Sequence, residues 1–182
     1  MKSIKTVFAI LLLALTISCS DENKDTGIPD ATSSTPLSNA DITLTAGGKE
    51  FKLSGPCGWA VAGGAHYIGA NQSDNNLKMF SAFFDIKELP TKTTTYTLRE
   101  YSLVEDESYV NMNISEISGN TLTSWISKST SGKLKLVVEG NKITVDLAGI
   151  ILYPEPKTIY EVGNVGAFAN NGVLTGTLTF YK

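Results

Sequence analysis

Residues 133–149 read KLKLVVEGNKITVDLAG, and this stretch decides the fold class. Apolar side chains occupy every second position on both sides of the Gly140-Asn141 dipeptide, an alternation that is typical of two half-buried β-strands. A two-residue turn at Gly140-Asn141 pairs Val138 with Ile143 and places a lysine opposite an aspartate further along. Because apolar side chains then face each other and opposite charges face each other, we predict a β-hairpin with this register.

The same period of two, with turn residues about every 8 to 12 positions, extends over most of the chain from residue 41 onward. So many short strands require either two packed sheets or a closed barrel. We therefore predict an all-β fold, specifically an antiparallel β-sandwich, with a lipocalin-like barrel as the alternative. In the last strand, Gly176 falls on the inner face, where a neighbour can approach closely. Besides the hairpin, the predicted strands are 41–46, 49–54, 58–62, 65–70, 77–86, 95–99, 108–115, 121–128, 149–153, 158–161 and 173–181.

The composition of the 182 residues fits a sheet-rich globular protein. Charged residues make up 18% of the chain, below the roughly 25% of an average soluble domain, which argues against a disordered chain or a charge-laced helical bundle. The formal net charge is −3. Proteins that bind nucleic acid neutralise its phosphates with clustered Lys and Arg, so we expect no nucleic-acid partner.

The first residues have the pattern of a signal peptide. Lys2 and Lys5 precede an apolar run from Val7 to Leu15, which small residues and Cys19 follow. This run is about half of the roughly 20 residues that a membrane-spanning helix needs. We therefore predict a cleaved signal peptide over residues 1–18.

The residues around the cleavage site carry a first resemblance. Ser18-Cys19 at the end of the apolar run resembles the lipobox of bacterial lipoproteins, which implies that Cys19 becomes the lipidated N-terminus, with palmitate-type acyl chains. Ser20, Asp21 and Glu22 follow directly and are similar to the surface-export signal of Bacteroidota-type lipoproteins. The resemblance implies a protein held in the outer membrane by the lipid on Cys19 and facing the cell exterior.

Residues 19–40 contain the lipidated cysteine and a polar stretch with Pro29 and Pro36 but no hydrophobic periodicity. We interpret this stretch as a flexible tether that spans on the order of 25 Å. Residues 41–182 then form a single β domain. With Cys19 acylated, Cys57 is the one remaining thiol, so no intramolecular disulfide is expected.

The stretch from Leu77 to the C-terminus carries a second resemblance. Its pattern comprises Leu89-Pro90 before Thr95-Tyr96-Thr97-Leu98, Ser131-Gly132-Lys133-Leu134 before the Gly-Asn hairpin, and a terminal Gly176-Thr177-Leu178-Thr179-Phe180. It resembles small uncharacterised surface lipoproteins of Bacteroidota-type outer membranes, which implies a lipid anchor and a β-sandwich-like domain. No functional residue follows from this resemblance.

Catalytic and metal-binding patterns are weak. Cys57-Gly58-Trp59 with His66 suggests an imidazole-activated thiol, but nine residues separate the two groups, and a buried, inert cysteine is the preferred interpretation. One free Cys and one His cannot provide a zinc site. The oxygen-rich segments 71–76 and 105–107 lack EF-hand spacing. We therefore expect no catalytic residue, no metal, no cofactor and no enzymatic activity.

Aromatic side chains with polar tips are the best candidates for ligand contact, because they stack on sugar rings or hold a protein partner. Trp125 shares a strand face with Thr123 and Ser127, which predicts a position on the polar face with a contact or rim role. Tyr67 is a second candidate. Trp59 is a third, although its small neighbours favour core packing.

These observations leave three functions open. The first is a non-enzymatic surface lipoprotein with a structural or adhesion role. The second is a glycan- or protein-binding module that uses exposed aromatic side chains. The third is a carrier of a small apolar ligand, which the barrel alternative would accommodate.

Overall fold

A computed structural model describes residues 37–74, 76–102, 105–155 and 169–182. The described residues form twelve strands and no α-helix, so the predicted all-β fold is confirmed. The predicted strand at 158–161 lies outside the described residues. The strands are β1 (Asn39–Ala46), β2 (Lys49–Gly55), β3 (Cys57–Ala62), β4 (Ala65–Ser73), β5 (Leu77–Phe84), β6 (Thr94–Arg99), β7 (Tyr109–Ser118), β8 (Thr121–Ile126), β9 (Lys133–Glu139), β10 (Lys142–Asp146), β11 (Ile151–Pro154) and β12 (Gly172–Tyr181).

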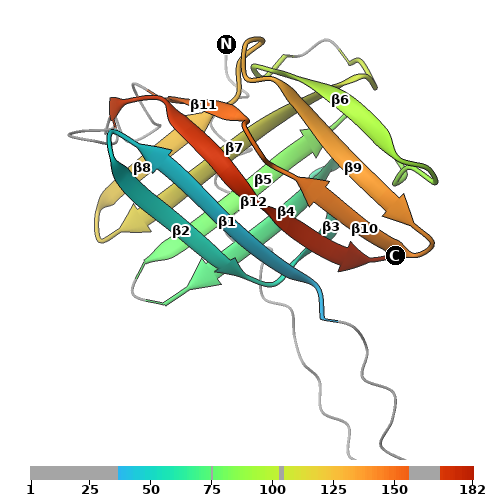
Figure 1. Ribbon diagram of the computed structural model, residues 1–182, viewed down its shortest axis with the longest axis horizontal. Helices are drawn as coiled ribbons and strands as arrows, with labels where there is room; N and C mark the ends of the chain where they lie inside the picture. The colour runs from blue at the N-terminus through green and yellow to red at the C-terminus, as the bar shows by residue number, and fades with distance from the viewer. Residues whose placement is uncertain (1–36, 75, 103–104, 156–168) are drawn as a thin grey trace, which may run out of the picture.

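The strands lie in two layers that face each other. One layer, here called the β12 layer, has the order β2-β1-β12-β10-β9-β6, and the other, the β5 layer, contains β8, β7, β5, β4 and β3. Figure 1 shows the strands of the β12 layer in front, running across those of the β5 layer behind them. Two sheets packed face to face bury the inner side chains of both, which is the sandwich-like arrangement that the sequence predicts.

Backbone hydrogen bonds continue from one layer into the other. The end of β6 pairs with the start of β7, and β11 pairs with both β12 and β8. β2 passes into β3 at Pro56, whose carbonyl accepts a hydrogen bond from the Asn71 amide at 3.4 Å. The pairing of β6 with β7 is parallel, so the sheet is mixed and the prediction of an entirely antiparallel sandwich is wrong at this one described pair.

The β9–β10 hairpin has the predicted register. Val138 lies opposite Ile143 and Lys135 opposite Asp146. Ile143 is fully buried, and Lys135 and Asp146 are exposed. A short turn and a one-sided apolar pattern are therefore sufficient to place both faces of this hairpin.

The core fills the space between the two layers. Leu134, Leu136 and Val145 from the hairpin pack there with residues from both layers. The largest fully buried side chains are Trp125, Phe80, Phe180, Ile42, Leu44, Leu53, Ile68, Leu98, Met112, Ile114, Leu134 and Leu136.

The predicted position of Trp125 on the polar face is wrong. Trp125 is 1% exposed, lies opposite the core residue Ile114 and makes an edge-on contact with Phe51 at 5.9 Å between ring centroids. The reason is Ser127, which is also 1% exposed and shares this face. Its hydroxyl donates to the Arg99 carbonyl at 2.6 Å and accepts from the Met112 amide at 2.8 Å. A hydroxyl with both bonds satisfied is tolerated in a core, so the face that looks polar in the sequence is the inner one.

Candidate ligand-binding face

The outer surface of the β5 layer is the face that points away from the core. Ile68 in β4, Ala82 in β5 and Met112 in β7 are buried between the layers, so the alternate residues of these strands point outward. We call this surface the neutral face. Its members are Gly58, Ala60 and Ala62 in β3, Tyr67, Gly69 and Asn71 in β4, Leu77, Met79, Ser81 and Phe83 in β5, Asn111, Asn113 and Ile117 in β7, and Leu122 and Ile126 in β8; Ser115 and Ser124 share this side of their strands but are buried.

None of these outward-facing strand residues carries a charge. The outer surface of the β12 layer differs, because it carries acidic and basic side chains among many threonines. Its exposed charged residues include Asp41, Glu50, Lys52, Lys133, Lys135 and Asp146. The two surfaces of the sandwich therefore differ in chemistry. Among the described strands, the outer surface of the β5 layer combines aromatic, amide and hydroxyl groups without charged side chains.

Tyr67 lies on β4, next to the edge strand β3, in the row of the neutral face that also contains Phe83 and Asn111. A Cβ atom added at Gly69 would lie 2.8 Å from Cε2 and 3.2 Å from Cδ2 of Tyr67, which shows that the tyrosine ring lies over the bare glycine. Phe83 lies directly opposite Tyr67 on β5, with 5.4 Å between ring centroids and 35° between ring planes. Tyr67 and Phe83 are both half-buried, and their neighbouring rings, inclined to each other, form a low, partly accessible aromatic platform.

Polar groups continue the same row across the sheet. Asn111 lies opposite Phe83, and Asn113 in the next outward row lies opposite Ser81. A side-chain amide carries two donor hydrogens and an acceptor oxygen, and a hydroxyl provides one donor and an acceptor. The platform is therefore bordered by groups that bind neutral polar ligands without the desolvation cost of a charge.

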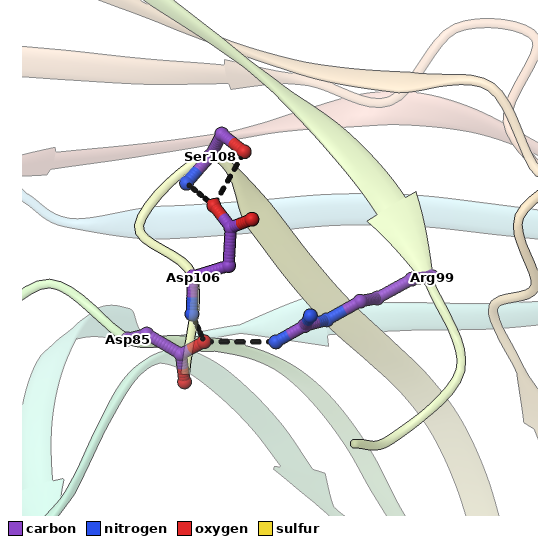
Figure 2. A network of polar contacts seen from close by, with 4 residues as sticks. All are labelled: Asp85, Arg99, Asp106 and Ser108. Carbon is purple, nitrogen blue, oxygen red and sulfur yellow. Dashed lines mark hydrogen bonds and ion pairs between the residues drawn. The ribbon is translucent and has the colours of Figure 1, made fainter. Parts of the chain in front are cut away.

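One margin of the neutral face ends in a charged network (Figure 2). Asp85 accepts hydrogen bonds from the Arg99 guanidinium at 2.9 Å and from the Asp106 amide at 2.7 Å. Asp106 in turn accepts from the hydroxyl and the amide of Ser108 at 2.6 and 2.9 Å, and these bonds hold the pKa of Asp106 below its usual value. The Arg99 guanidinium also lies over the Tyr109 ring, 4.8 Å from its centroid.

This network joins the end of β5, the end of β6 and the turn before β7. Arg99 lies opposite Asn111 in the parallel pairing, so the paired charges of Arg99 and Asp85 are next to the amide row. Their side chains are only 18% and 28% exposed. We interpret the network as a fixed margin that holds the strands of the neutral face in register.

The three aromatic residues that the sequence suggests as ligand contacts lie in three different environments. Tyr67 lies on the neutral face, Trp125 lies in the core, and Trp59 is half-buried on the core side of β3, 5.6 Å from the Phe84 ring. Sequence reasoning missed Phe83 and Asn111. The alternation within 77–86 and 108–115 predicts that Phe83 and Asn111 each point outward. The sequence does not show that they are neighbours, because this depends on the pairing of β5 with β7.

Cys57 and His66 do not form a catalytic pair. Cys57 lies opposite Ala70 and His66 opposite Val61, four positions further along β3, which corresponds to about 13 Å. The Cys57 thiol donates to the Thr179 carbonyl at 3.3 Å, and burial raises its pKa to about 11. A thiol with so high a pKa is a poor nucleophile at neutral pH.

The two oxygen-rich segments are used in local turns. Asp74 accepts hydrogen bonds from Gln72 at 2.8 Å and from the Asn76 amide at 3.2 Å, and Asp106 caps the turn to Ser108. Within the described ranges, no group of three or more His, Cys, Asp and Glu side chains converges as metal ligands would.

Comparison with protein-family models, curated proteins and solved structures identifies no significant match. In the part of the chain that the structure covers, no helix has the length and hydrophobicity needed to cross a bilayer. Residues 1–36, including Cys19, Ser20, Asp21 and Glu22, lie outside the described residues.

Proposed function

We propose that this protein is a lipid-anchored, non-enzymatic protein of the outer-membrane surface that adheres to neutral glycans through the neutral face. The single observation that carries the proposal is the Tyr67 ring, which lies over Gly69 and beside Phe83 on the outward face of the β5 layer. An aromatic ring of this kind stacks on the apolar face of a sugar ring, while amides and hydroxyls bind the sugar hydroxyls. The absence of charge on the outward strand residues favours a neutral sugar over an acidic one.

The position of the chain's entry supports the same proposal. The predicted tether leads into β1 at Asn39, and β1 belongs to the β12 layer. The neutral face lies on the opposite side of the sandwich, so the point where the tether joins the domain does not lie on this face. The interior, filled by side chains such as Trp125, Phe80 and Phe180, is less suitable for a carried ligand than the surface.

The first prediction concerns the platform. Tyr67→Ala in the lipid-free chain, residues 20–182, is expected to weaken binding to a neutral glycan by about tenfold or more, because a central aromatic contact contributes at least 1 to 2 kcal/mol. The measurement is a screen of neutral and acidic glycans on an array, followed by calorimetric titration of each neutral hexasaccharide that binds.

Tyr181→Ala is the matched control, because Tyr181 belongs to the outward-facing set of β12 on the opposite surface. It should bind as the wild-type chain does. The proposal fails if no neutral glycan binds, or if both tyrosine variants bind equally well.

The second prediction tests the orientation of the ring. Gly69→Ala places a methyl group where the Tyr67 ring now lies, so the ring must tilt away from the sheet. We expect a folded domain with glycan affinity reduced severalfold, since a tilted ring no longer offers a flat stacking surface. Unchanged affinity together with an unchanged tyrosine environment in near-UV circular dichroism would contradict the platform geometry.

The third prediction concerns the anchor. Cys19→Ser is expected to shift the protein from the membrane fraction to the soluble fraction or to leave it uncleaved, because the acylated sulfur is lost. Changing Asp21 and Glu22 to Ala should preserve lipidation and reduce protease accessibility in intact cells. Normal membrane retention of the first variant, or normal accessibility of the second, would remove the corresponding part of the proposal.

A further inference from the structure

The two strands at the ends of the hydrogen-bonded ladder are protected differently. The ladder ends with β2 on one side and β3 on the other. β2 carries Lys49, Glu50 and Lys52, and charges of this kind discourage an edge strand from pairing with another chain. β3 has the sequence CGWAVA, without a charge or a proline. The β3 edge therefore lacks the usual protection.

The geometry of the β3–β4 hairpin shows which backbone groups point outward. The turn residues Gly63 and Gly64 have φ values of 58° and 82°, as in a type I′ two-residue turn, and Ala62 lies opposite Ala65. The residues that flank such a turn exchange both hydrogen bonds, and the pattern alternates along the strand. Trp59 and Val61 therefore direct their N–H and C=O groups away from β4.

Within the described residues, the outward backbone groups of Trp59 and Val61 have no hydrogen-bond partner. In the same part of the chain, β3 pairs with β4 alone. The Val61 side chain is 57% exposed, which places this end of β3 at the surface. The beginning of the strand differs, because Cys57 is in contact with the end of β12 through Thr179.

We propose that β3 pairs in an antiparallel manner with β3 of a second copy of this chain, so that the two domains form a symmetric dimer. Two-fold antiparallel pairing is self-complementary, and an uncharged edge meets its own copy without repulsion. In this arrangement the outward-pointing N–H and C=O groups of Trp59 form hydrogen bonds with those of Val61 in the second copy. This register places Ala60 on the two-fold axis, directly opposite Ala60 of the second copy.

The dimer joins the two neutral faces into one surface. Edge-to-edge pairing keeps both outer faces on the same side, and Ala60 lies opposite Tyr67 within each domain. The two Tyr67 rings then stand in one row, three strand spacings or about 14 Å apart, with alanines between them. Dimer formation does not depend on glycan binding, but it would present two platforms to one extended chain.

The direct test is a disulfide at the two-fold axis. In a Cys57→Ser background of the chain of residues 20–182, Ala60→Cys is expected to form a disulfide-linked dimer under mild oxidation, because facing residues at such a position have Cα atoms about 4.5 Å apart. Ala62→Cys is the matched control. In the proposed register Ala62 faces Gly58 of the second copy, so its cross-linking should be at least tenfold less efficient.

A second variant tests the interface without a cross-link. Light scattering should give the mass of a dimer for the wild-type chain, and Ala60→Glu should weaken the dimer at least tenfold by placing two like charges on the axis. Thr175→Glu, on the outer surface of the β12 layer, should leave the dimer unchanged. A monomeric wild-type chain, a dimer that tolerates Ala60→Glu, or equal cross-linking of both cysteine variants would overturn the proposal. None of these readouts involves a glycan.

Discussion

Trp125→Ala is expected to lower the free energy of unfolding by about 3 to 5 kcal/mol, a large share of the 5 to 15 kcal/mol that stabilises a typical domain. The Trp125 side chain is 1% exposed, and its indole N–H donates to the Asn170 carbonyl at 3.4 Å. It also fills the space between Phe51 of the β12 layer and the β8 strand on which it lies. Truncation therefore leaves a cavity that joins both layers, and urea denaturation measures the loss.

The chain contains one matched control for this variant, because it has only two tryptophans. Trp59 is half-buried at the border of the core, so Trp59→Ala removes fewer contacts. We expect it to cost clearly less than Trp125→Ala. A Trp125→Ala variant that unfolds at the wild-type urea concentration would contradict the burial on which the assignment of faces depends.

Gly176→Ala is expected to destabilise the domain by at least about 2 kcal/mol. Gly176 has a φ of 103°, which L-amino acids rarely adopt, and a Cβ atom there would collide with the backbone carbonyl of Asp41 in β1. The carbonyl cannot move without disturbing the β1–β12 ladder. Thermal or urea unfolding of the variant gives the loss of stability directly.

Gly48→Ala separates the two causes of this destabilisation, which are backbone strain at a positive φ and the collision of the added Cβ atom with β1. Gly48 also has a positive φ, 74°, but nothing lies within 4 Å of its added Cβ. Its substitution therefore carries the backbone strain alone, about 1 kcal/mol. If Gly48→Ala and Gly176→Ala lower the free energy of unfolding equally, the close approach of β1 to Gly176 does not contribute to the loss of stability.

The sequence predicts the local elements of this fold well, because each strand and turn carries its own signal. Gly140-Asn141 and the alternation around it place the β9–β10 hairpin in the observed register. The predicted close approach of a neighbouring strand to Gly176 is also observed. The neighbour is the β1 backbone: Gly176 lies opposite the fully buried Ile42, in the predicted inner-face register, although Gly176 itself is exposed.

Faces are harder to predict where polar residues are buried. In β8 the alternation is correct but the orientation is reversed, because Ser127 and Trp125 share the inner face. The hydrogen bonds that make Ser127 acceptable there come from Arg99 and Met112, which are distant in sequence. Their contribution cannot be seen in the residues around Trp125.

The candidate site was only partly predictable for a similar reason. Tyr67 is identified by its residue type, but the platform also needs Phe83 opposite it and Gly69 beneath it. Asn111 joins the row through β5–β7 pairing, between strands that β6 separates in the sequence. Long-range pairing of this kind follows from packing of the whole domain rather than from local patterns.

Glycan binding by the neutral face is tested most sharply by a map of backbone amide shifts in the lipid-free chain, measured by NMR during titration with neutral hexasaccharides of glucose, mannose, galactose or xylose. If the neutral face binds neutral glycans, at least one of these sugars shifts the amides of Tyr67, Gly69, Phe83 and Asn111. Those of Thr43, Thr144 and Thr175, on the outer surface of the β12 layer, should not move. Shifts confined to the β12 layer, or no shift with any of the four sugars, would contradict the assignment of the neutral face as a glycan-binding surface.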